Sequence, residues 1–278
     1  TRGEAAMRHR ISITAIIGIL IILACAGGAV LAPWIAPYDP NLPLGSRWEP
    51  PSAQYWLGLD QIGRDMLSRI LYGGRISIGL ALLATVLAFV VGIITGFAAA
   101  VFGGWVDVAL SRIADVILSI PILMSALIII SGFGTSTTVL VLTIGFLYSV
   151  IVFRVARALA MNIAVLDYVE VARLRGEGLM WVILREILPN ALPPLAAEFG
   201  LRFCFAFLFV AALSFLGLGV QPPEADWGSM VKESALAIPA GIAAPLYPAA
   251  AIALLTIGVN LVVDWLLSIY SRPQGENA

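Results

Sequence analysis

The sequence predicts an all-α membrane protein with six transmembrane helices, and three observations lead to this fold class. The 278-residue chain is 60% hydrophobic and 12% charged, whereas globular domains carry about 25% charged residues. Its apolar residues gather in six runs of about 20 residues, the length that crosses a hydrocarbon layer of roughly 30 Å. Polar, Pro-rich or Gly-rich segments separate these runs, so each run can form one span.

The first apolar run covers residues 11–32 and follows a basic start that contains Arg8 and Arg10. Such a start is also typical of a signal peptide, and Ile22-Leu-Ala-Cys25 loosely resembles a lipoprotein processing site. The run is longer than the roughly 7–15-residue core of a signal peptide and continues past Cys25. We therefore expect a retained first span.

Residues 33–75 are predicted to form a long loop after this span. Six prolines keep its backbone extended: Pro33, Pro37, Pro40, Pro43, Pro50 and Pro51. Near its end, residues 63–72 carry apolar side chains at helical spacing, which predicts a short interfacial helix. Arg64, Arg69 and Arg75 would then lie at the level of the lipid headgroups.

The second span is predicted over 76–101. Gly92 and Gly96 have the GxxxG spacing that lets another helix approach closely. The four later spans are predicted at 108–130, 139–160, 192–216 and 245–267. Pro121 predicts a kink in the third span. Between the last two, residues 217–228 break any helix and 232–242 are expected to form a surface helix.

Residues 167–190 are the one long, charge-rich amphipathic segment in the second half of the chain. Asp167 and Glu170 have the spacing of a capping box, so a helix is expected to begin at Tyr168.

Two glycines follow this helix. Gly176 and Gly178 are expected to end it, and a second short helix over 179–188 is expected to stop before Pro189. Residues 167–190 thus form two short helices joined by glycines, a segment here called the elbow. Its position between spans indicates a docking surface rather than a pore.

The arginines predict the orientation. Six spans put both termini and the elbow on one side, which collects most of the positive charge: Arg2, Arg8, Arg10, Arg112, Arg154, Arg157, Arg173, Arg175, Arg185 and Arg272. The positive-inside bias places that side in the cytoplasm. The loop 33–75 is therefore expected to be extracytoplasmic.

Charged residues inside the predicted spans are candidate functional residues, because an unpaired charge is costly there. Glu198 and Arg202 stand four residues apart and can pair on one helix face. They could line a translocation path or form a local pair against another helix. Asp115 and Asp264 lie near cytoplasmic span ends, where a carboxylate can reach water or pair with Arg112, so a structural role is expected.

Several function classes are excluded. The sequence contains no GxxxxGK[ST], GxSxG, HExxH or GxGxxG pattern. It has one Lys (Lys232), one His (His9) and two distant cysteines, Cys25 and Cys204, without metal-ligand spacing. The net charge of −1 argues against a nucleic-acid partner. We expect no catalytic residue, metal site or cofactor in this chain.

Two motifs resemble a known family. Glu170-Val-Ala172, Gly176 and Ile187-Leu-Pro189-Asn together resemble the EAA loop of ABC importer permeases, with Val171 in place of the middle alanine. Residues 57–65, Leu-Gly-Leu-Asp-Gln-Ile-Gly-Arg-Asp, are similar to the LGTDxxGRD signature of the dipeptide, oligopeptide and nickel permeases, with Leu59 in place of Thr. Further matches are Gly103-Gly-Trp-Val-Asp107, Phe215 to Pro223, Trp227-Gly228 and Asn260 to Asp264. The segment 35–40 resembles the DppC-like subunits.

This resemblance implies a permease subunit that forms half of the translocation pathway of an ATP-driven ABC importer for peptides, in the bacterial inner membrane. It implies a DppB-like permease partner, two ATP-binding subunits that hold ATP and Mg, and an extracytoplasmic substrate-binding protein. The EAA loop would be the cytoplasmic coupling helix of the fold, and the resemblance assigns coupling to Asp167, Glu170, Ala172, Arg173, Gly176, Ile187, Leu188 and Pro189. The domains would be 1–75, a permease core 76–271 with the coupling loop 162–190, and a cytoplasmic tail 272–278.

Other functions stay open. Permeases of this kind also import nickel chelates, glutathione, opines or oligosaccharides. A transporter driven by an ion gradient would instead show an internal repeat and broken helices with midplane charges, and the sequence shows no repeat. A membrane enzyme would need a paired nucleophile and base, which the spans lack.

Overall fold

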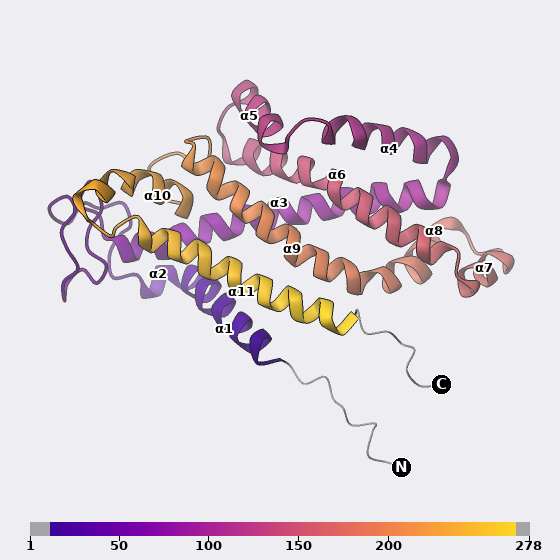
Figure 1. The fold of residues 1–278 in the computed structure, drawn as a ribbon, viewed down its shortest axis with the longest axis horizontal. Helices are drawn as coiled ribbons and strands as arrows, with labels where there is room; N and C mark the ends of the chain where they lie inside the picture. The colour runs from indigo at the N-terminus through magenta and orange to yellow at the C-terminus, as the bar shows by residue number, and fades with distance from the viewer. Residues whose placement is uncertain (1–11, 271–278) are drawn as a thin grey trace, which may run out of the picture.

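A computed structural model describes residues 12–270; the predicted basic start and polar tail lie outside this range. Figure 1 shows an elongated bundle with α7 and α8 at one end and the loop before α3 with α10 at the other, here called the distal end. All named elements of the described part are helices, which confirms the all-α prediction. Their bounds are α1 Ile13–Val30, α2 Ala32–Ile35, α3 Met66–Phe102, α4 Gly104–Leu118, α5 Ile122–Phe133, α6 Thr137–Ala164, α7 Asp167–Leu174, α8 Leu179–Val182, the π-helix η1 Ile183–Ile187, α9 Leu188–Phe215, α10 Trp227–Ser234, the 3-10 helix η2 Ala235–Ala240 and α11 Leu246–Tyr270.

Five described helices are long and apolar enough to cross a membrane, and α4 with α5 makes a sixth span when the bent pair is counted as one. That pair is bent by 86°, far more than the predicted kink. The α4 helix ends at a hydrogen bond from the Ser119 N–H to Asp115 O at 3.0 Å. Pro121 then adopts an extended ψ of 130° ahead of α5. Because the residue before a proline avoids helical geometry, the span breaks completely here.

The α3 helix packs along α6 through two glycines (Figure 1). A Cβ added at Gly92 would lie 2.6 Å from Val152 Cβ, and one added at Gly96 would lie 2.8 Å from Phe153 O. Both approaches are closer than ordinary van der Waals contact, so the GxxxG spacing marks a real helix crossing.

The α1 and α11 helices cross in the same manner. A Cβ added at Gly18 would lie 2.6 Å from the carbonyl oxygen of Gly258. Gly27, on the same helix, has no neighbouring atom within 4 Å of its Cβ position. The first span therefore packs against the last one and comes very close to it at Gly18.

The predicted separate interfacial helix is wrong, because α3 runs without interruption from Met66 to Phe102. Asp65 caps it by accepting the N–H of Ser68 at 2.8 Å. The proposed domain boundary at residue 75 falls within this helix. The surface helix predicted at 232–242 is also displaced: α10 begins at Trp227, where the Asp226 side chain caps it, and η2 follows.

Candidate functional site

The α7 helix begins one residue earlier than the capping-box pattern predicts. Leu166 is its N-cap residue, and the Leu166 carbonyl accepts the N–H groups of Val169 at 2.9 Å and Glu170 at 3.2 Å. Asp167 is therefore the first helical residue and its side chain caps nothing. The predicted capping box is wrong, although both carboxylates still lie in the first turn, where the helix dipole favours negative charge.

The turn after α7 depends on one glycine. Gly176 has φ of 84°, in the left-handed region, and its N–H bonds to Arg173 O at 2.9 Å. The N–H of Glu177 bonds to Ala172 O at 3.2 Å, which closes the end of the helix. Gly178 has φ of −70° and precedes α8. Only Gly176 therefore needs the conformational freedom of glycine.

The helix after this turn does not stop before Pro189 as predicted, but continues from Leu179 to Phe215. One π turn at Ile183–Ile187 precedes the proline, and the N–H of Leu188 bonds to Ile183 O, five residues back. The Asn190 side chain then donates to Glu186 O at 2.6 Å. The wider turn and this side-chain bond accommodate a residue that has no N–H of its own. The helix that contains the predicted fifth span therefore begins well before residue 192.

The eight predicted coupling residues divide into buried and exposed sets. Ala172 and Ile187 are fully buried, and Ile187 joins Val169 and Val182 in the apolar core that also contains Ala160 of α6. Leu188 is half-buried, and the remaining five residues are exposed: Asp167, Glu170, Arg173, Gly176 and Pro189. The buried set holds the elbow on the bundle, and the charged set faces outward.

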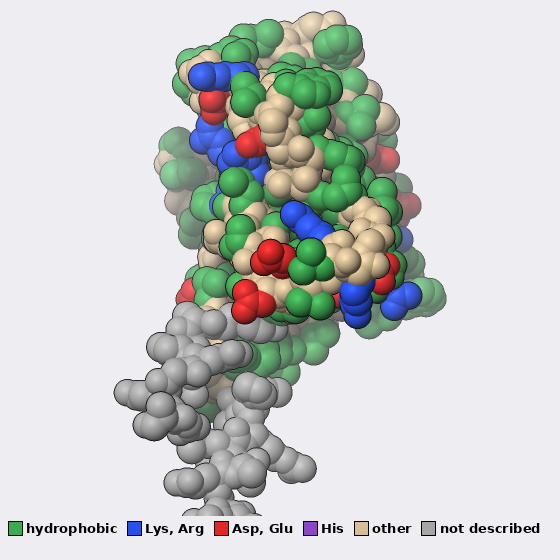
Figure 2. All heavy atoms as spheres, turned by 90° about the vertical axis from the view of Figure 1, so that its right-hand side faces the viewer, with side chains coloured by type: hydrophobic (Ala, Val, Ile, Leu, Met, Phe, Trp, Pro, Cys, Tyr) green, Lys and Arg blue, Asp and Glu red, His purple; other side chains and the backbone are tan. Residues whose placement is uncertain are grey.

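Apolar side chains also face outward here, which the sequence reading missed. Leu174 is 80% exposed, and Val171 and Met180 are exposed beside it in the chain. Arg175 lies over the Trp181 ring at 5.9 Å and joins the two sides of the turn. Figure 2 looks onto this end of the molecule and shows apolar, acidic and basic side chains side by side. Such a mixed patch is typical of an interaction surface.

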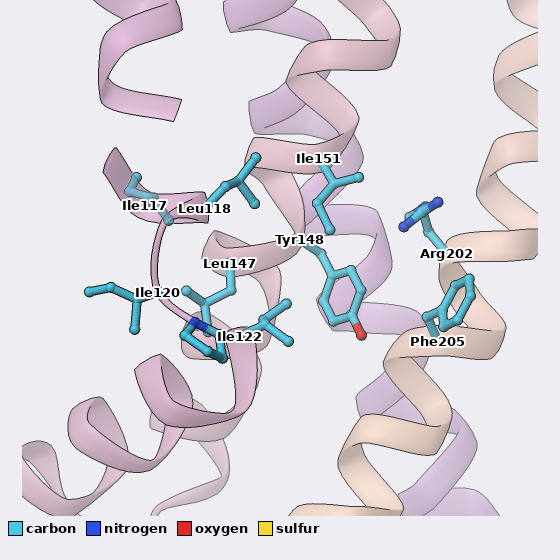
Figure 3. A pocket seen from close by; sticks show the side chains of 10 residues that line it. Ile117, Leu118, Ile120, Ile122, Leu147, Tyr148, Ile151, Arg202 and Phe205 are labelled. Carbon is cyan, nitrogen blue, oxygen red and sulfur yellow. The ribbon is translucent and has the colours of Figure 1, made fainter. Parts of the chain in front are cut away.

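Glu198 and Arg202 form the predicted pair within α9. Arg202 Nε donates to Glu198 Oε1 at 2.5 Å, and the side chains are 16% and 15% exposed. The guanidinium lies 5.2 Å from the centre of the Phe205 ring. Arg202 and Phe205 border a cavity of about 330 Å³ that Tyr148 of α6 and the break between α4 and α5 also line (Figure 3).

Two charged pairs tie α4 to α6, whereas Asp264 of α11 is exposed and pairs with no described residue, so its structural role stays a prediction. Asp115 pairs with Arg154 of α6 at 2.7 Å rather than with Arg112, because α6 lies beside α4. Asp107 binds Arg157 of α6 through both carboxylate oxygens. These pairs have a structural role, as expected for Asp115.

Four charged side chains form a cluster at the distal end, and two of them, Asp60 and Arg64, belong to the signature at residues 57–65. Asp60 Oδ2 accepts Arg64 Nε at 2.6 Å and Arg69 Nη1 at 2.5 Å. Glu233 of α10 accepts Arg64 Nη2 at 3.0 Å and lies 3.1 Å from Arg69 Nη2. We call these residues the distal cluster. Arg69 is only 1% exposed, so the predicted placement of Arg64 and Arg69 among lipid headgroups is wrong.

The distal cluster carries two positive and two negative charges. Burial raises the pKa of the Glu233 carboxyl, an effect that Arg64 opposes. The cluster connects the loop before α3 to α10 through ion pairs.

Comparison with known proteins agrees with this architecture. Residues 88–273 match the family described as "Binding-protein-dependent transport system inner membrane component". A "Probable D,D-dipeptide transport system permease protein" of Escherichia coli is 34% identical over 263 residues, 94% of this chain and 87% of that protein. A dipeptide transport system permease protein of Alkalihalophilus pseudofirmus is 33% identical over 254 residues, 91% and 83% of the two chains.

A glutathione transport system permease protein of Pectobacterium atrosepticum is 30% identical over 263 residues, 94% of this chain and 86% of that protein. The family match covers more than half of the chain, and the relatives extend over nearly all of it. The apolar spans described above are those of a multi-pass membrane protein. The chain therefore belongs to the family of inner-membrane components of binding-protein-dependent transport systems, the permease subunits of ABC importers.

Proposed function

We propose that this chain forms half of the membrane pathway of a peptide importer and that α7 and α8 dock a separate ATPase. The observation that carries the proposal is the division of the elbow. Ala172 and Ile187 hold it on the bundle, while Leu174, Glu170 and Arg173 face outward. An apolar side chain exposed among charges is costly in water and is stabilised when a partner covers it.

The relatives support peptides as the cargo. Two are named for dipeptides and one for glutathione, which is itself a tripeptide. All of these cargoes carry amide and carboxylate groups, which a pathway can contact whatever the side chains are. Nickel chelates, opines and oligosaccharides are alternative cargoes, and the ligand of the binding protein encoded beside this chain would distinguish them.

The proposed assembly has four kinds of subunit: this chain, a second DppB-like permease, two ATP-binding subunits and an extracytoplasmic binding protein. The ATPases would hold ATP and Mg, since the sequence has no phosphate-binding loop. Both termini and the elbow would face the cytoplasm, as the arginine distribution indicates.

Motion would pass from the ATPases to the pathway by rigid-body movement. Closure of the two ATPases would displace α7 and α8. Because the helix is continuous from Leu179 to Phe215, this displacement would reach Glu198 and Arg202 without a loop to absorb it.

An ion-gradient transporter is the rival, and the break between α4 and α5 and the Glu198–Arg202 pair in α9 are the observations in its favour. In such transporters the broken ends face charged substrates, yet here Ile117, Leu118, Ile120 and Ile122 line the cavity at the break. Substrate uptake by this chain alone, driven by an ion gradient, would support the rival.

Glu170 provides the test. Its side chain takes no part in a helix cap, so a substitution there removes no capping hydrogen bond. We expect Glu170→Lys to abolish ATPase co-purification and substrate-stimulated ATP hydrolysis. Glu224→Lys, the same reversal at an exposed distal site, should retain both. Normal coupled hydrolysis in Glu170→Lys membranes would refute the docking role.

A further inference from the structure

The two Nη atoms of Arg202 are hydrogen-bond donors without an acceptor among the described residues, and they face a cavity. The Arg202 Nε is bound to Glu198, whereas no described residue accepts a hydrogen bond from its two Nη atoms. Figure 3 shows the guanidinium pointing into the space between α9 and α6, toward Tyr148. Apart from Arg202 and the Tyr148 hydroxyl, the lining side chains are apolar: Ile117, Leu118, Ile120, Pro121, Ile122, Leu147, Ile151 and Phe205.

A hydrogen-bond donor without an acceptor is unusual at the position of Arg202 in its helix. Arg202 and Glu198 lie near the middle of α9, a spanning helix, where a charge is costly and commonly marks a transport path. The ion pair removes the net charge of the site. It leaves the planar Nη groups, which are suited to carbonyl and carboxylate oxygens.

We propose that the Arg202 Nη groups bind acceptor oxygens of the passing peptide, and that Glu198 keeps the site neutral so that acidic and basic peptides pass at similar rates. The proposal rests on the peptide-importer function above. Backbone carbonyls and the C-terminal carboxylate are the shared ligand chemistry, because every peptide carries both.

Neutrality is the property that a path for varied peptides needs. An uncompensated guanidinium in a low-dielectric cavity would hold an acidic side chain and repel a lysine side chain. With Glu198 2.5 Å from Nε, the pair has no net charge, so its field acts only weakly on a peptide side chain several ångströms away. The Nη donors still form charge-assisted hydrogen bonds with an oxygen in direct contact.

The test uses the complete importer in proteoliposomes with its own binding protein. ATP-driven uptake is measured for three tripeptides that differ only in a central Glu, Ala or Lys. We expect Glu198→Gln to raise the ratio of Glu-peptide to Lys-peptide uptake about tenfold over the native complex. Arg202→Gln, which leaves Glu198 uncompensated, should shift the ratio in the opposite direction. Glu198→Asp preserves the charge and should keep the native ratio.

Asp115→Asn is the matched control, since it breaks the ion pair with Arg154 elsewhere in the bundle and should leave the ratio unchanged. Peptides with an amidated C-terminus separate the two ligand groups. Slower uptake of the amides, with the difference lost in Arg202→Gln, assigns the site to the carboxylate. Equal uptake assigns it to backbone carbonyls.

Two results would overturn the proposal. One is an unchanged charge ratio in both Glu198→Gln and Arg202→Gln while the Ala peptide is still imported. The other is loss of the second permease from purified Arg202→Gln complexes, which would place the Nη donors in the subunit interface. Absence of ATP-driven uptake of any peptide by the native complex would instead refute the peptide-importer function itself.

Discussion

Arg64 and Glu233 lie 169 positions apart in the chain, yet Arg64 Nη2 donates to Glu233 Oε2 at 3.0 Å. Arg64 belongs to the loop before α3, and Glu233 belongs to α10. The pair therefore joins two segments that precede and follow most of the bundle in the sequence. Asp60 completes the bridge by binding both Arg64 and Arg69.

Removing the Asp60 charge should destabilise the distal end. Asp60→Asn leaves two buried guanidinium groups opposite a single carboxylate, and breaking a buried charge network in this way typically costs about 3–5 kcal/mol. We expect a clear drop in the thermal unfolding temperature of the purified complex. Glu224→Gln removes an exposed carboxylate at the same end and should leave that temperature unchanged. Equal unfolding temperatures in the two variants would contradict a stabilising role for the cluster.

The distal cluster should also make stability depend on pH through Glu233. Burial raises the pKa of this carboxyl above its ordinary value of 4.5, so the folded protein keeps a proton that the unfolded chain releases. The contribution of this group to stability is then fully present below pH 4.5 and is lost as the pH rises through the folded-state pKa. We expect the unfolding free energy of the native protein, relative to Glu233→Gln, to fall as the pH rises. Chemical unfolding at a series of pH values measures this, and parallel curves would be evidence against it.

The crossing of α1 and α11 should be sensitive to one methyl group. Gly18→Ala would place its Cβ 2.6 Å from Gly258 O, and forcing two packed helices apart typically costs about 1–3 kcal/mol. Gly27→Ala adds the same methyl group to the same helix in open space and should be neutral or slightly stabilising. Thermal unfolding of both variants compares them directly. A destabilised Gly27→Ala would show that helix composition, rather than contact, controls the result.

Gly176 and Gly178 of the elbow should tolerate substitution by alanine to different extents. Gly176→Ala forces a side chain into a left-handed backbone at a cost of about 1–2 kcal/mol, which should displace α8 relative to α7. We expect substrate-stimulated ATP hydrolysis to fall several-fold in the reconstituted importer. Gly178→Ala keeps an ordinary backbone conformation and should remain near native activity. Similar activities of the two variants would mean that the turn tolerates rearrangement.

Features set by local periodicity were predictable from the sequence. The apolar runs located the spans, because length and hydropathy alone determine which segments can cross a membrane. The spacing of Glu198 and Arg202 predicted their pairing, since side chains four apart share a helix face. Gly92 and Gly96 marked a helix crossing for the same reason.

Features set by distant contacts were not predictable. Nothing near Arg64 indicates that Glu233 would cover it, so the arginine was expected at the membrane surface. Pro189 suggested a helix end because the rule for prolines assumes an α turn before them, whereas a π turn stands there. Pro121 suggested a kink, yet a proline pattern does not specify the angle between the two helices.

Because the helix from Leu179 to Phe215 is unbroken, a tilt about its distal end moves the elbow further than it moves the middle of the helix. At 1.5 Å per residue its 37 residues extend about 55 Å, so a tilt of about 5° about the distal end would displace the elbow by about 5 Å. Arg202 lies roughly 20 Å from that end and would move by about 2 Å, enough to make or release a hydrogen bond. A small displacement of the elbow would thus become, at Arg202, a movement of the size that makes or breaks one hydrogen bond.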